Sequence, residues 1–543
     1  MNRSRMRACI AAAAGAMLLY VLLVLPASPR DLSDAALTFP LEWVVLVSGL
    51  VVVPPHWRVG AALSACITFA LMLIVLLKIG DFAMLSALNR PFSPVVDMFL
   101  IRAGFDVVSG SIGPVAAWIA ASLGFVAFCT LTFAVYLALR RITRHPLSPR
   151  ARLATGAVFA GAVILALADY GKARGIWSIP VEPPGSASNA VLAAAQITRG
   201  RDALSELRLF RTAAARDPYK GQSALFDRTG GRDIVVIYIE SYGKTSFDNP
   251  LYAPTHVGTL GRAEAELSGA GYAMRSGWLN SPTAGGQSWL AHGTLGSGLR
   301  TTDQGRYGAM LASGRQSLFH LAQASGFRTA AVMPAITLAW PEGLTMGFDT
   351  ILAADDLGYA GLPFNWVTMP DQYTLSAYAA LLPPDPRPDF LQIALISSHA
   401  PWVPVPRMID WADVGDGTVF NEIAASGDTP AAVWRDRDRV RDQYRLAVDY
   451  SLKAATAYAA RRDDLPLFVI LGDHQPAGFV AGSDSRDVAV HLIGPPDLIA
   501  QADGWEWQDG MVPQADTPVW PMEDFRDRFI RAYSTLSRMA DAS

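Results

Sequence analysis

Cysteine is scarce in this chain of 543 residues, and its three cysteines all lie in hydrophobic stretches of the first third. They are Cys9, Cys66 and Cys129. The remaining two-thirds of the chain therefore contains no disulfide of its own. A domain of that size can build an adequate core without one, so the lack of cysteine does not decide between the cytoplasm and an extracytoplasmic compartment.

Charge is also sparse, at 17% of residues against 51% hydrophobic ones. Residues 1–171 carry 13 basic and 7 acidic side chains, a net charge of +6. Residues 172–543 carry 32 basic and 41 acidic side chains, a net charge of −9. The polar part thus lacks the basic surface that binding to a phosphate backbone requires, and nucleic acid is not expected as a partner.

The first third contains five apolar stretches, each close to the ~20 residues that a helix needs to cross a bilayer. They lie near residues 6–26, 37–55, 59–78, 113–139 and 152–170. Arginines precede the first stretch and crowd the loop between the fourth and fifth, which predicts that both regions are cytoplasmic. Five crossings then place the chain after about residue 172 outside, in a bacterium in the periplasm or at the cell surface.

Two polar segments adjoin these stretches. Residues 79–112 are too polar to cross the membrane, and we expect either a helix in the outer interface or an ordinary loop. After the last stretch, prolines and glycine break the chain, and residues 186–189 supply N-cap candidates for a helix to about residue 215. These features predict a transmembrane domain over residues 1–171, linker helices over 172–228 and an extracytoplasmic catalytic domain over 229–543.

Polar residues follow three apolar runs that are typical of buried parallel strands. The run at residues 233–239 ends in Glu240, the run at 390–396 leads to His399, and the run at 467–471 leads to Asp473 and His474. Open α/β sheets bind ligands at the carboxyl ends of their strands. Neighbouring carboxylate and imidazole groups suit a borderline divalent cation, so the pattern predicts a metal site at this edge.

A fourth piece reads Ser-Pro-Thr-Ala-Gly-Gly-Gln-Ser-Trp-Leu-Ala-His over residues 281–292, a glycine turn followed by a helix start. Free N–H groups and the helix dipole favour negative charge at such a position. A hydroxyl there is well placed to carry a phosphoryl or sulfuryl group. Ser288 is the first candidate for this role and Thr283 the second, and the alternative for Ser288 is a simple helix N-cap.

Together these residues resemble the alkaline-phosphatase-like sulfatase superfamily, and within it the membrane-anchored phosphotransferases. That group includes lipoteichoic acid synthases, phosphoglycerol transferases of periplasmic glucans and phosphoethanolamine transferases of lipid A. The likeness covers about residues 230–500, where Gly-Asp-His-Gln-Pro and Ser-Ser-His-Ala-Pro are fairly specific together. It implies an α/β sulfatase-like domain, with a mostly parallel sheet covered by helices, behind a multi-span membrane domain.

The resemblance also implies the chemistry. One divalent ion, zinc or manganese, is held by Glu240, Asp473, His474 and the oxygen of the nucleophile Ser288, and His399 is the substrate-side histidine. The donor is a membrane phospholipid, whose phosphoethanolamine or phosphoglycerol head group passes through a phosphorylated serine. The acceptor is an envelope glycan or lipid.

Three departures from the family pattern stand beside this likeness. The nucleophile is Ser288 where the best-known phosphotransferases have threonine, with Thr283 as a further substrate-side candidate. Trp340 matches the start of a Trp-x-Arg motif of lipoteichoic acid synthases, but Glu342 stands at the arginine position. The region around Ser281 does not fit the Cys/Ser-x-Pro-x-Arg motif of true sulfatases, so the sulfatase name describes a fold.

Several alternatives stay open at this point. The same site with water as acceptor gives a hydrolase of phosphodiesters, phosphonates or sulfate esters, and a degenerate domain gives a membrane sensor or scaffold. His491 is interpreted first as a strand residue, and second as a later metal-site histidine. The aromatic residues after position 499 belong either to a helix that packs on the sheet or to a glycan-binding surface.

Overall fold

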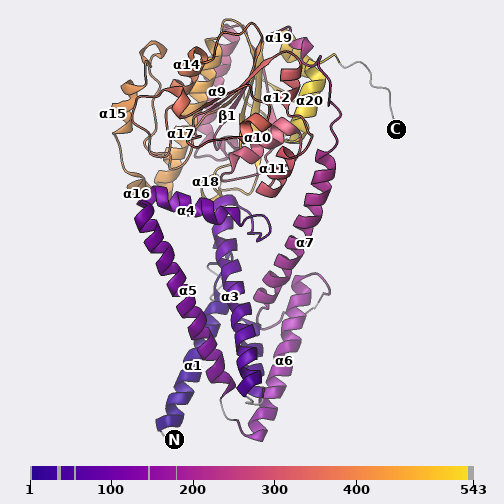
Figure 1. Cartoon of the computed structure of the whole chain (residues 1–543), viewed down its shortest axis with the longest axis vertical. Coiled ribbons are helices and arrows are strands. Elements are labelled where there is room, and N and C mark those ends of the chain that lie inside the picture. Colours follow the sequence, from indigo (N-terminus) through magenta and orange to yellow (C-terminus); the bar gives the residue numbers. More distant parts are fainter. Residues whose placement is uncertain are drawn as a thin grey trace, which may run out of the picture. The chain divides into compact units, whose positions relative to one another are not determined.

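The computed structural model describes residues 3–32, 38–53, 57–144, 147–178, 180 and 182–535. By its internal contacts the chain divides into two compact units. The amino-terminal unit comprises residues 1–86 and 90–206, and the carboxyl-terminal unit comprises residues 87–89 and 207–543. The two units are shown in Figure 1 and are described separately below.

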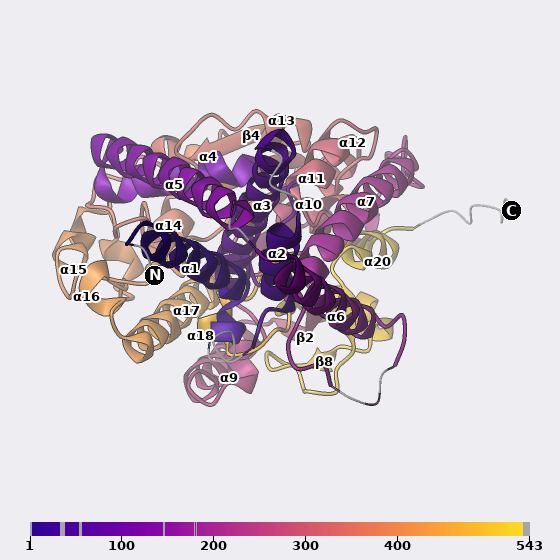
Figure 2. The same ribbon diagram turned by 90° about the horizontal axis from the view of Figure 1, so that it is seen from below.

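The amino-terminal unit is helical. Its helices are α1 (Arg3–Val24), α2 (Leu41–Val52), α3 (Trp57–Leu88), α4 (Phe99–Ile112), α5 (Pro114–Thr143), α6 (Pro149–Ala173) and the first part of α7 (Ser188–Ala214). Within this unit, the start of α1, the end of α5 and the start of α6 lie at the same end (Figure 1). Seen from below, α1 lies beside α5 and α2 lies beside α6 (Figure 2). The arginine-rich segments used for orientation thus share one end of the unit.

Among the described residues, three helices are long and apolar enough to cross a membrane: Gly60–Leu88, Pro114–Thr143 and Pro149–Ala173. The apolar helices Cys9–Val24 and Leu41–Val52 are shorter. At 1.5 Å per residue, the 12 residues of α2 extend only about 18 Å, against a hydrocarbon core of about 30 Å. Only α2 is thus clearly shorter than the predicted span, since α1 as a whole has 22 residues. The predicted number of five crossings stays a prediction. Residues 37 and 54–55 of the second predicted stretch lie outside the described residues.

The segment 79–112 also differs from the expectation. Its first ten residues continue α3 as far as Leu88, so the polar residues there extend a long helix instead of forming a loop. A separate helix, α4, covers Phe99–Ile112. Asp81 explains part of this extension, because its carboxylate accepts hydrogen bonds from the backbone N–H of Phe92 and the side-chain amide of Gln196.

Glu42, an unusual residue in an apolar stretch, accepts hydrogen bonds from the start of α7. Its Oε1 accepts the backbone N–H groups of Asn189 at 2.9 Å and Ala190 at 3.2 Å. Free N–H groups at a helix start need acceptors, and a carboxylate also favours the positive end of the helix dipole. The cap of this helix therefore includes a group distant in sequence, beside the local Ser186–Asn189 segment that the sequence indicated.

The carboxyl-terminal unit is built on one mixed sheet, in which the described residues form nine strands. The order is β4-β3-β5-β1-β6-β7-β2-β8, and β9 pairs with β2. The strands are β1 (Ile234–Ile239), β2 (Ala273–Asn280), β3 (Arg328–Met333), β4 (Thr350–Ala353), β5 (Asp389–Ala394), β6 (Leu467–Gly472), β7 (Asp487–Gly494), β8 (Gln508–Asp509) and β9 (Val519–Pro521). Strands β4, β3, β5, β1 and β6 are parallel, while β7 is antiparallel to β6 and β2.

Alternate residues of the central strand β1 enter two different cores. Val235, Ile237 and Ile239 pack under α9 (Ala253–Gly269), α14 (Asp371–Leu381) and α17 (Arg437–Ala460). Ile234, Val236 and Tyr238 pack on the other face under α10 (Ser288–Ser297), α12 (Leu318–Ala324) and α20 (Asp524–Tyr533). Both faces of the sheet are covered by helices (Figure 1), which is why these strands are apolar throughout.

The carboxyl-terminal aromatic residues belong to the second of these cores. Trp505, Trp507 and Trp520 are all less than 10% exposed, and their rings lie between 4.8 and 5.4 Å apart by centroids. The helix α20 packs beside them through Phe525 and Phe529. The prediction that this segment packs back on the sheet is confirmed, and residues 536–543 lie outside the described part.

Candidate active site

The site begins with two parallel strands that end side by side. β1 and β6 pair in register, with Ile239 opposite Gly472. The next residue on each strand carries a carboxylate, so Glu240 and Asp473 project from adjacent strand ends. Both side chains are buried, as is His474 immediately after Asp473. The topology thus assembles an acid, a second acid and an imidazole at the carboxyl edge of the sheet, as the sequence pattern indicated.

Ser288 completes this group from a different element. Its Oγ donates a hydrogen bond to Glu240 Oε2 at 2.8 Å and lies 3.3 Å from His474 Nε2. The same His474 nitrogen lies 3.1 Å from Glu240 Oε1 and 3.8 Å from Asp473 Oδ2. All four residues predicted as metal ligands are therefore brought together in one cluster.

His474 is fixed in a single ring orientation. Its Nδ1 lies 2.8 Å from the carbonyl oxygen of Gln475. Because a carbonyl only accepts, Nδ1 carries the hydrogen, and Nε2 is the nitrogen that faces Glu240 and Ser288. A backbone partner on the far ring nitrogen is the usual way in which proteins orient a metal-binding histidine.

Hydrogen bonds from the backbone also fix the orientation of the Asp473 carboxylate. Its Oδ1 accepts the backbone N–H groups of Ser241 at 2.8 Å and His474 at 2.7 Å. The other oxygen, Oδ2, is the one directed at the His474 ring. The carbonyl of the same residue accepts the Ser281 hydroxyl at 2.6 Å, which ties this strand end to the start of the nucleophile turn.

The charges within the cluster are strongly coupled. Burial would raise the pKa of Glu240, but the neighbouring His474 keeps it well below its ordinary value. Burial and then the charge of Glu240 raise the pKa of Asp473 to about 8. Burial would lower the pKa of His474, but Asp473 and Glu240 raise it to about 9. In the absence of a cation, the group therefore retains protons on Asp473 and His474 at neutral pH, because bare negative charges cannot share so small a buried volume.

The glycine turn places Ser288 as the first residue of α10, after a left-handed residue at Gln287. The turn is held against the loop that follows β6, because the backbone N–H of Gly285 donates to the carbonyl of Gln475 at 2.8 Å. Thr283, the competing nucleophile candidate, donates its hydroxyl to the carbonyl of Gly286 at 2.7 Å within the turn. The hydroxyl of Thr283 closes the turn, whereas the hydroxyl of Ser288 faces the acidic cluster.

His399 lies beyond the end of β5, partly buried, with Nδ1 at 2.5 Å from the carbonyl oxygen of Ala400. Its charge is one of the influences that lower the pKa of Glu240, after His474. Sequence reasoning missed the residue that shapes this loop, Asp371, a fully buried acid at the start of α14. Its Oδ1 accepts the N–H groups of Ile396 and Ser397, each at 2.8 Å. Nothing in the local pattern around Asp371 distinguishes it from an ordinary helix cap.

The remaining candidates lie in other surroundings. Trp340 is half-buried, and its ring packs against Phe348 at a centroid distance of 6.2 Å. His491 is fully buried in β7, with Nε2 at 3.0 Å from the Tyr242 hydroxyl and Nδ1 at 2.7 Å from the Ser276 hydroxyl. Both of its nitrogens have partners, which supports the strand interpretation. The substrate role of Trp340 stays a prediction.

The cluster suits a divalent metal ion by its chemistry. Glu240, Asp473 and His474 are buried, and their ligand atoms lie within 4.8 Å of one another. Two carboxylates, one imidazole with a free Nε2 and one hydroxyl form a mixed oxygen and nitrogen set, appropriate for zinc or manganese. Tetrahedral zinc with bonds near 2.0–2.2 Å separates its ligand atoms by about 3.3 Å. The distances of 2.8 to 3.8 Å found here are close to that spacing.

Comparison with known proteins agrees with the resemblance seen in the sequence. Residues 232–489 match the family model described as Sulfatase. The carboxyl-terminal unit thus contains a sulfatase-like domain, and the described part of the amino-terminal unit has three long apolar helices. A search of curated proteins gives no match.

Solved structures with some likeness include two transferases and a synthase. The lipooligosaccharide phosphoethanolamine transferase EptA from Neisseria meningitidis is 13% identical, with a TM-score of 0.44 over 86% of this chain and 84% of its own. The phosphoglycerol transferase GacH from Streptococcus pyogenes, solved with sn-glycerol-1-phosphate, is 13% identical, with a TM-score of 0.37 over 62% and 83%. The lipoteichoic acid synthase LtaP from Listeria monocytogenes is 12% identical, with a TM-score of 0.36 over 61% and 79%.

Proposed function

We propose that this protein is a metal-dependent phosphotransferase. It takes a phosphoethanolamine or phosphoglycerol head group from a membrane phospholipid and passes it to an envelope glycan or lipid through a phosphorylated Ser288. The observation that carries the proposal is the position of the Ser288 hydroxyl, hydrogen-bonded to Glu240 and 3.3 Å from His474 Nε2. A serine used only as a helix cap would turn its oxygen to the backbone N–H groups of its own helix, and Ser288 does not.

Glu240, Asp473, His474 and Ser288 are the residues that would hold the ion. When bound, a divalent cation lowers the pKa of a coordinated hydroxyl and stabilises negative charge on phosphoryl oxygens. Asp473 and His474 are pre-oriented for this task by backbone hydrogen bonds, so little ordering is required when the ion enters.

The chain's own groups account for the transfer step. Ser288 donates its hydrogen to the ionised carboxylate of Glu240, which directs the oxygen lone pairs away from that acid and towards an incoming phosphorus atom. As the oxygen attacks the head-group phosphorus, its proton passes to Glu240 and the bond from phosphorus to the diacylglycerol oxygen breaks. His399 supplies a proton to that leaving oxygen, or alternatively positions the acceptor. The first turn of α10 presents free N–H groups, which favour the anionic phosphoryl group carried on Ser288.

The second half reverses the first. An acceptor hydroxyl gives its proton to His399 and attacks the phosphorus of the phosphoserine, the bond to Ser288 Oγ breaks, and Glu240 returns the proton to the serine. The long apolar helices keep the enzyme in the membrane that contains the donor lipid. The same location gives access to acceptors on the extracytoplasmic side.

Mass spectrometry of the trapped intermediate tests the proposal. Purified protein is incubated with phosphatidylethanolamine or phosphatidylglycerol and then digested. We expect a head-group phosphate adduct on the peptide containing Ser288, and we expect it to be lost in Ser288→Ala. Removing the nucleophile should lower turnover by at least about a thousandfold. Ser268→Ala, an exposed serine on α9, serves as the matched control and should retain the adduct.

Full activity in Ser288→Ala would contradict the assignment of the nucleophile. An adduct that moves to Thr283 would favour the second candidate, although the Thr283 hydroxyl is engaged within the turn. Release of the free head-group phosphate at the same rate with and without an acceptor would identify a hydrolase instead of a transferase.

A further inference from the structure

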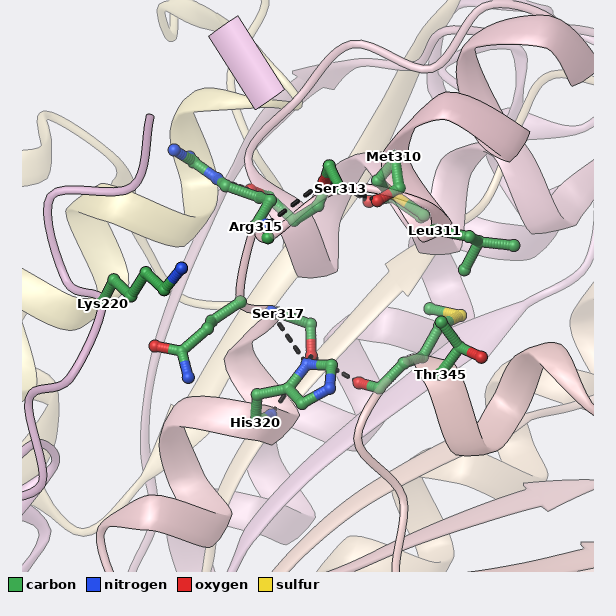
Figure 3. A pocket seen from close by; sticks show the side chains of 13 residues that line it. Lys220, Met310, Leu311, Ser313, Arg315, Ser317, His320 and Thr345 are labelled. Carbon is green, nitrogen blue, oxygen red and sulfur yellow. Dashed lines mark hydrogen bonds between the residues drawn. The ribbon is translucent and has the colours of Figure 1, made fainter. Parts of the chain in front are cut away.

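A second cavity in the carboxyl-terminal unit has no role in the site described above. It encloses about 440 Å³ and is lined by the second half of α10, by the segment 310–320 and by the end of a short helix, α13 (Glu342–Thr345). Its volume is within the range of ordinary small-molecule sites. Figure 3 shows Lys220, Ser317, His320 and Thr345 around this hollow. Neither Ser288 nor any of the three acidic and imidazole ligands lines it.

Hydrogen-bond donors face this cavity without partners among the described residues. The Lys220 ammonium forms no ion pair there, and its Nζ lies close to the position that a Cβ would take on Gly314. Gln316 accepts a hydrogen bond from the N–H of Gly221 through Oε1, which leaves its NH₂ group free. The Thr345 hydroxyl, on an exposed residue, is likewise unused.

His320 presents another donor for a specific reason. The backbone N–H of Ser317 donates to its Nδ1 at 3.2 Å as part of the capping arrangement of α12. Nδ1 is therefore the acceptor nitrogen of the neutral ring, and the hydrogen resides on Nε2. Burial lowers the pKa of His320, which keeps the ring in this neutral form. No described residue accepts the Nε2 hydrogen.

No acid opposes these donors. The residues that line the cavity include Lys220, Arg315 and His320 but neither aspartate nor glutamate. Asp217, three residues before Lys220, already accepts hydrogen bonds from Arg526 and from the N–H of Gln316. The Arg315 guanidinium is already bound to backbone carbonyls, including that of Ser297 at 2.7 Å, and lies 3.9 Å from Asp527, so it is not counted among the free donors.

We propose that this cavity is a second ligand site, which binds a phosphate monoester attached to a small carbon skeleton. A phosphate dianion accepts hydrogen bonds on several oxygens and donates almost none, which matches the four free donors. Lys220 supplies a full positive charge, and His320, Gln316 and Thr345 supply directed hydrogens. Met310, Leu311 and Met346 form an apolar wall beside them, which accommodates carbon atoms next to the phosphate.

Calorimetric titration of the full-length protein in detergent tests this site. The titrants are sn-glycerol 3-phosphate, short-chain phosphatidic acid and, as the uncharged blank, glycerol, at constant ionic strength. EDTA is present throughout, so that a metal-bound phosphate does not contribute. We expect both or one of the phosphate compounds to bind, and the tighter of the two identifies a soluble or a lipid source.

Two variants and one local measurement locate the binding. Lys220→Gln should weaken binding about tenfold, because a charge-assisted contact is lost. Lys453→Gln removes another partly exposed lysine, paired with Asp449, and should bind like the wild type. Amide hydrogen exchange over residues 313–320 should slow on binding in the wild type and in Ser288→Ala.

The outcomes are decisive in both directions. Equal affinity in Lys220→Gln and wild type, or heat no greater than that of glycerol, would overturn the second site. Since Lys220 is exposed, its substitution leaves the core intact, and an unchanged melting temperature confirms that the variant is folded. Binding that weakens in Lys220→Gln but is unchanged in Ser288→Ala separates this site from the proposed catalytic one, so the two proposals stand or fall independently.

Discussion

At the scale of single residues, the cluster around Ser288 depends on hydrogen bonds that leave each reactive atom one direction. His474 donates a hydrogen bond from Nδ1 to a carbonyl, and one oxygen of Asp473 accepts hydrogen bonds from two backbone N–H groups. His474 Nε2 and the Glu240 carboxylate then face the serine hydroxyl, and Asp473 Oδ2 lies 3.8 Å from the same nitrogen. Catalytic power in such sites comes from preorganisation of this kind.

Metal binding should release protons. Without a cation, the pKa of Asp473 is raised to about 8 and that of His474 to about 9, so both are protonated at pH 7. A metal ligand must be deprotonated, and we expect about two protons to leave for each ion bound. Calorimetry of Zn²⁺ binding in buffers of different ionisation enthalpy measures this number.

Asp473→Asn provides the control for proton release. It removes one titrating group and should reduce the release to about one proton, with weaker binding. Release that is unchanged in this variant, or absent in the wild type, would show that the cluster is already ionised before metal enters.

Acid should destabilise the carboxyl-terminal unit through a buried histidine. Burial lowers the pKa of His491 to about 3, whereas an unfolded histidine titrates near its ordinary value of 6.5. Below pH 6.5 His491 binds a proton in the unfolded chain but not in the folded one, so the free energy of unfolding falls as the pH drops from 6.5 towards 3. At pH 5 the loss is about 2 kcal/mol from this residue.

His491→Gln isolates this contribution, because an amide can still meet the hydroxyls of Tyr242 and Ser276. The difference in unfolding free energy between pH 7 and pH 5, measured by urea titration, should shrink by about 2 kcal/mol. His256, also buried and with its pKa lowered to about 4, supplies a remaining acid sensitivity in the variant. An identical pH dependence in both proteins would contradict the argument.

At the scale of elements, the ends of the strands determine the site. The parallel register of β1 and β6 places Glu240 beside Asp473, and Gly472 allows the segment that follows β1 to approach the end of β6 closely. A Cβ on Gly472 would lie 1.8 Å from the carbonyl oxygen of Tyr242, a backbone atom that cannot move alone. Close backbone approach, and not conformational freedom, accounts for glycine at this position.

Gly472→Ala should therefore misplace the neighbouring metal ligands. We expect a loss of about 1–3 kcal/mol or more in unfolding free energy, together with weaker Zn²⁺ binding in equilibrium dialysis. Gly269→Ala is the matched control, because a Cβ there meets nothing within 4 Å at the end of α9. Wild-type zinc affinity in Gly472→Ala would refute this role of the glycine.

The sequence predicted these strand ends well and their supports poorly. Apolar runs that stop at Glu240 or at Asp473 carry a pattern that parallel sheets impose, so the gathering of acids and imidazole could be anticipated. The backbone groups of Ser241 and Gln475 have no signature in a sequence, because every residue has them. Asp371 was missed for a related reason, since its partners are amides 25 and 26 residues away in the chain.

The helices of the amino-terminal unit show a second limit. Apolar composition indicated where they lie, but it did not give the length of α2, which has only 12 helical residues, starting directly after Pro40. The continuation of α3 through residues 79–88 was also not predicted, because Asp81 appears costly until its buried partners, Phe92 N–H and Gln196, are known. The length of a helix and the hydrogen-bond partners of its buried polar side chains both depend on tertiary contacts.

At the scale of the whole molecule, orientation across the membrane is the main expectation to test. Basic residues gather at one end of the amino-terminal unit, which predicts that this end is cytoplasmic and that the sulfatase-like domain is extracytoplasmic. Ser426→Cys, on an exposed turn of that domain, should react with a membrane-impermeant maleimide in intact cells. Arg144→Cys, exposed at the end of α5, should react only after the cells are opened.

The native cysteines give the background for this labelling experiment. Cys66 and Cys129 lie within long apolar helices, where a water-soluble reagent does not reach them. Labelling of residue 144 but not residue 426 in intact cells would show that the protein has the opposite orientation in the membrane. It would also remove the proposed access to extracytoplasmic acceptors.

The carbonyl oxygen of Gln475 accepts two hydrogens, one from the His474 ring and one from the N–H of Gly285 in the nucleophile turn. A single peptide group thus orients the His474 ring and also holds the turn that leads to Ser288. Replacing only one of these two loops by the corresponding loop of a relative would remove a hydrogen bond on which the other depends. We therefore expect the two loops to be exchangeable only together.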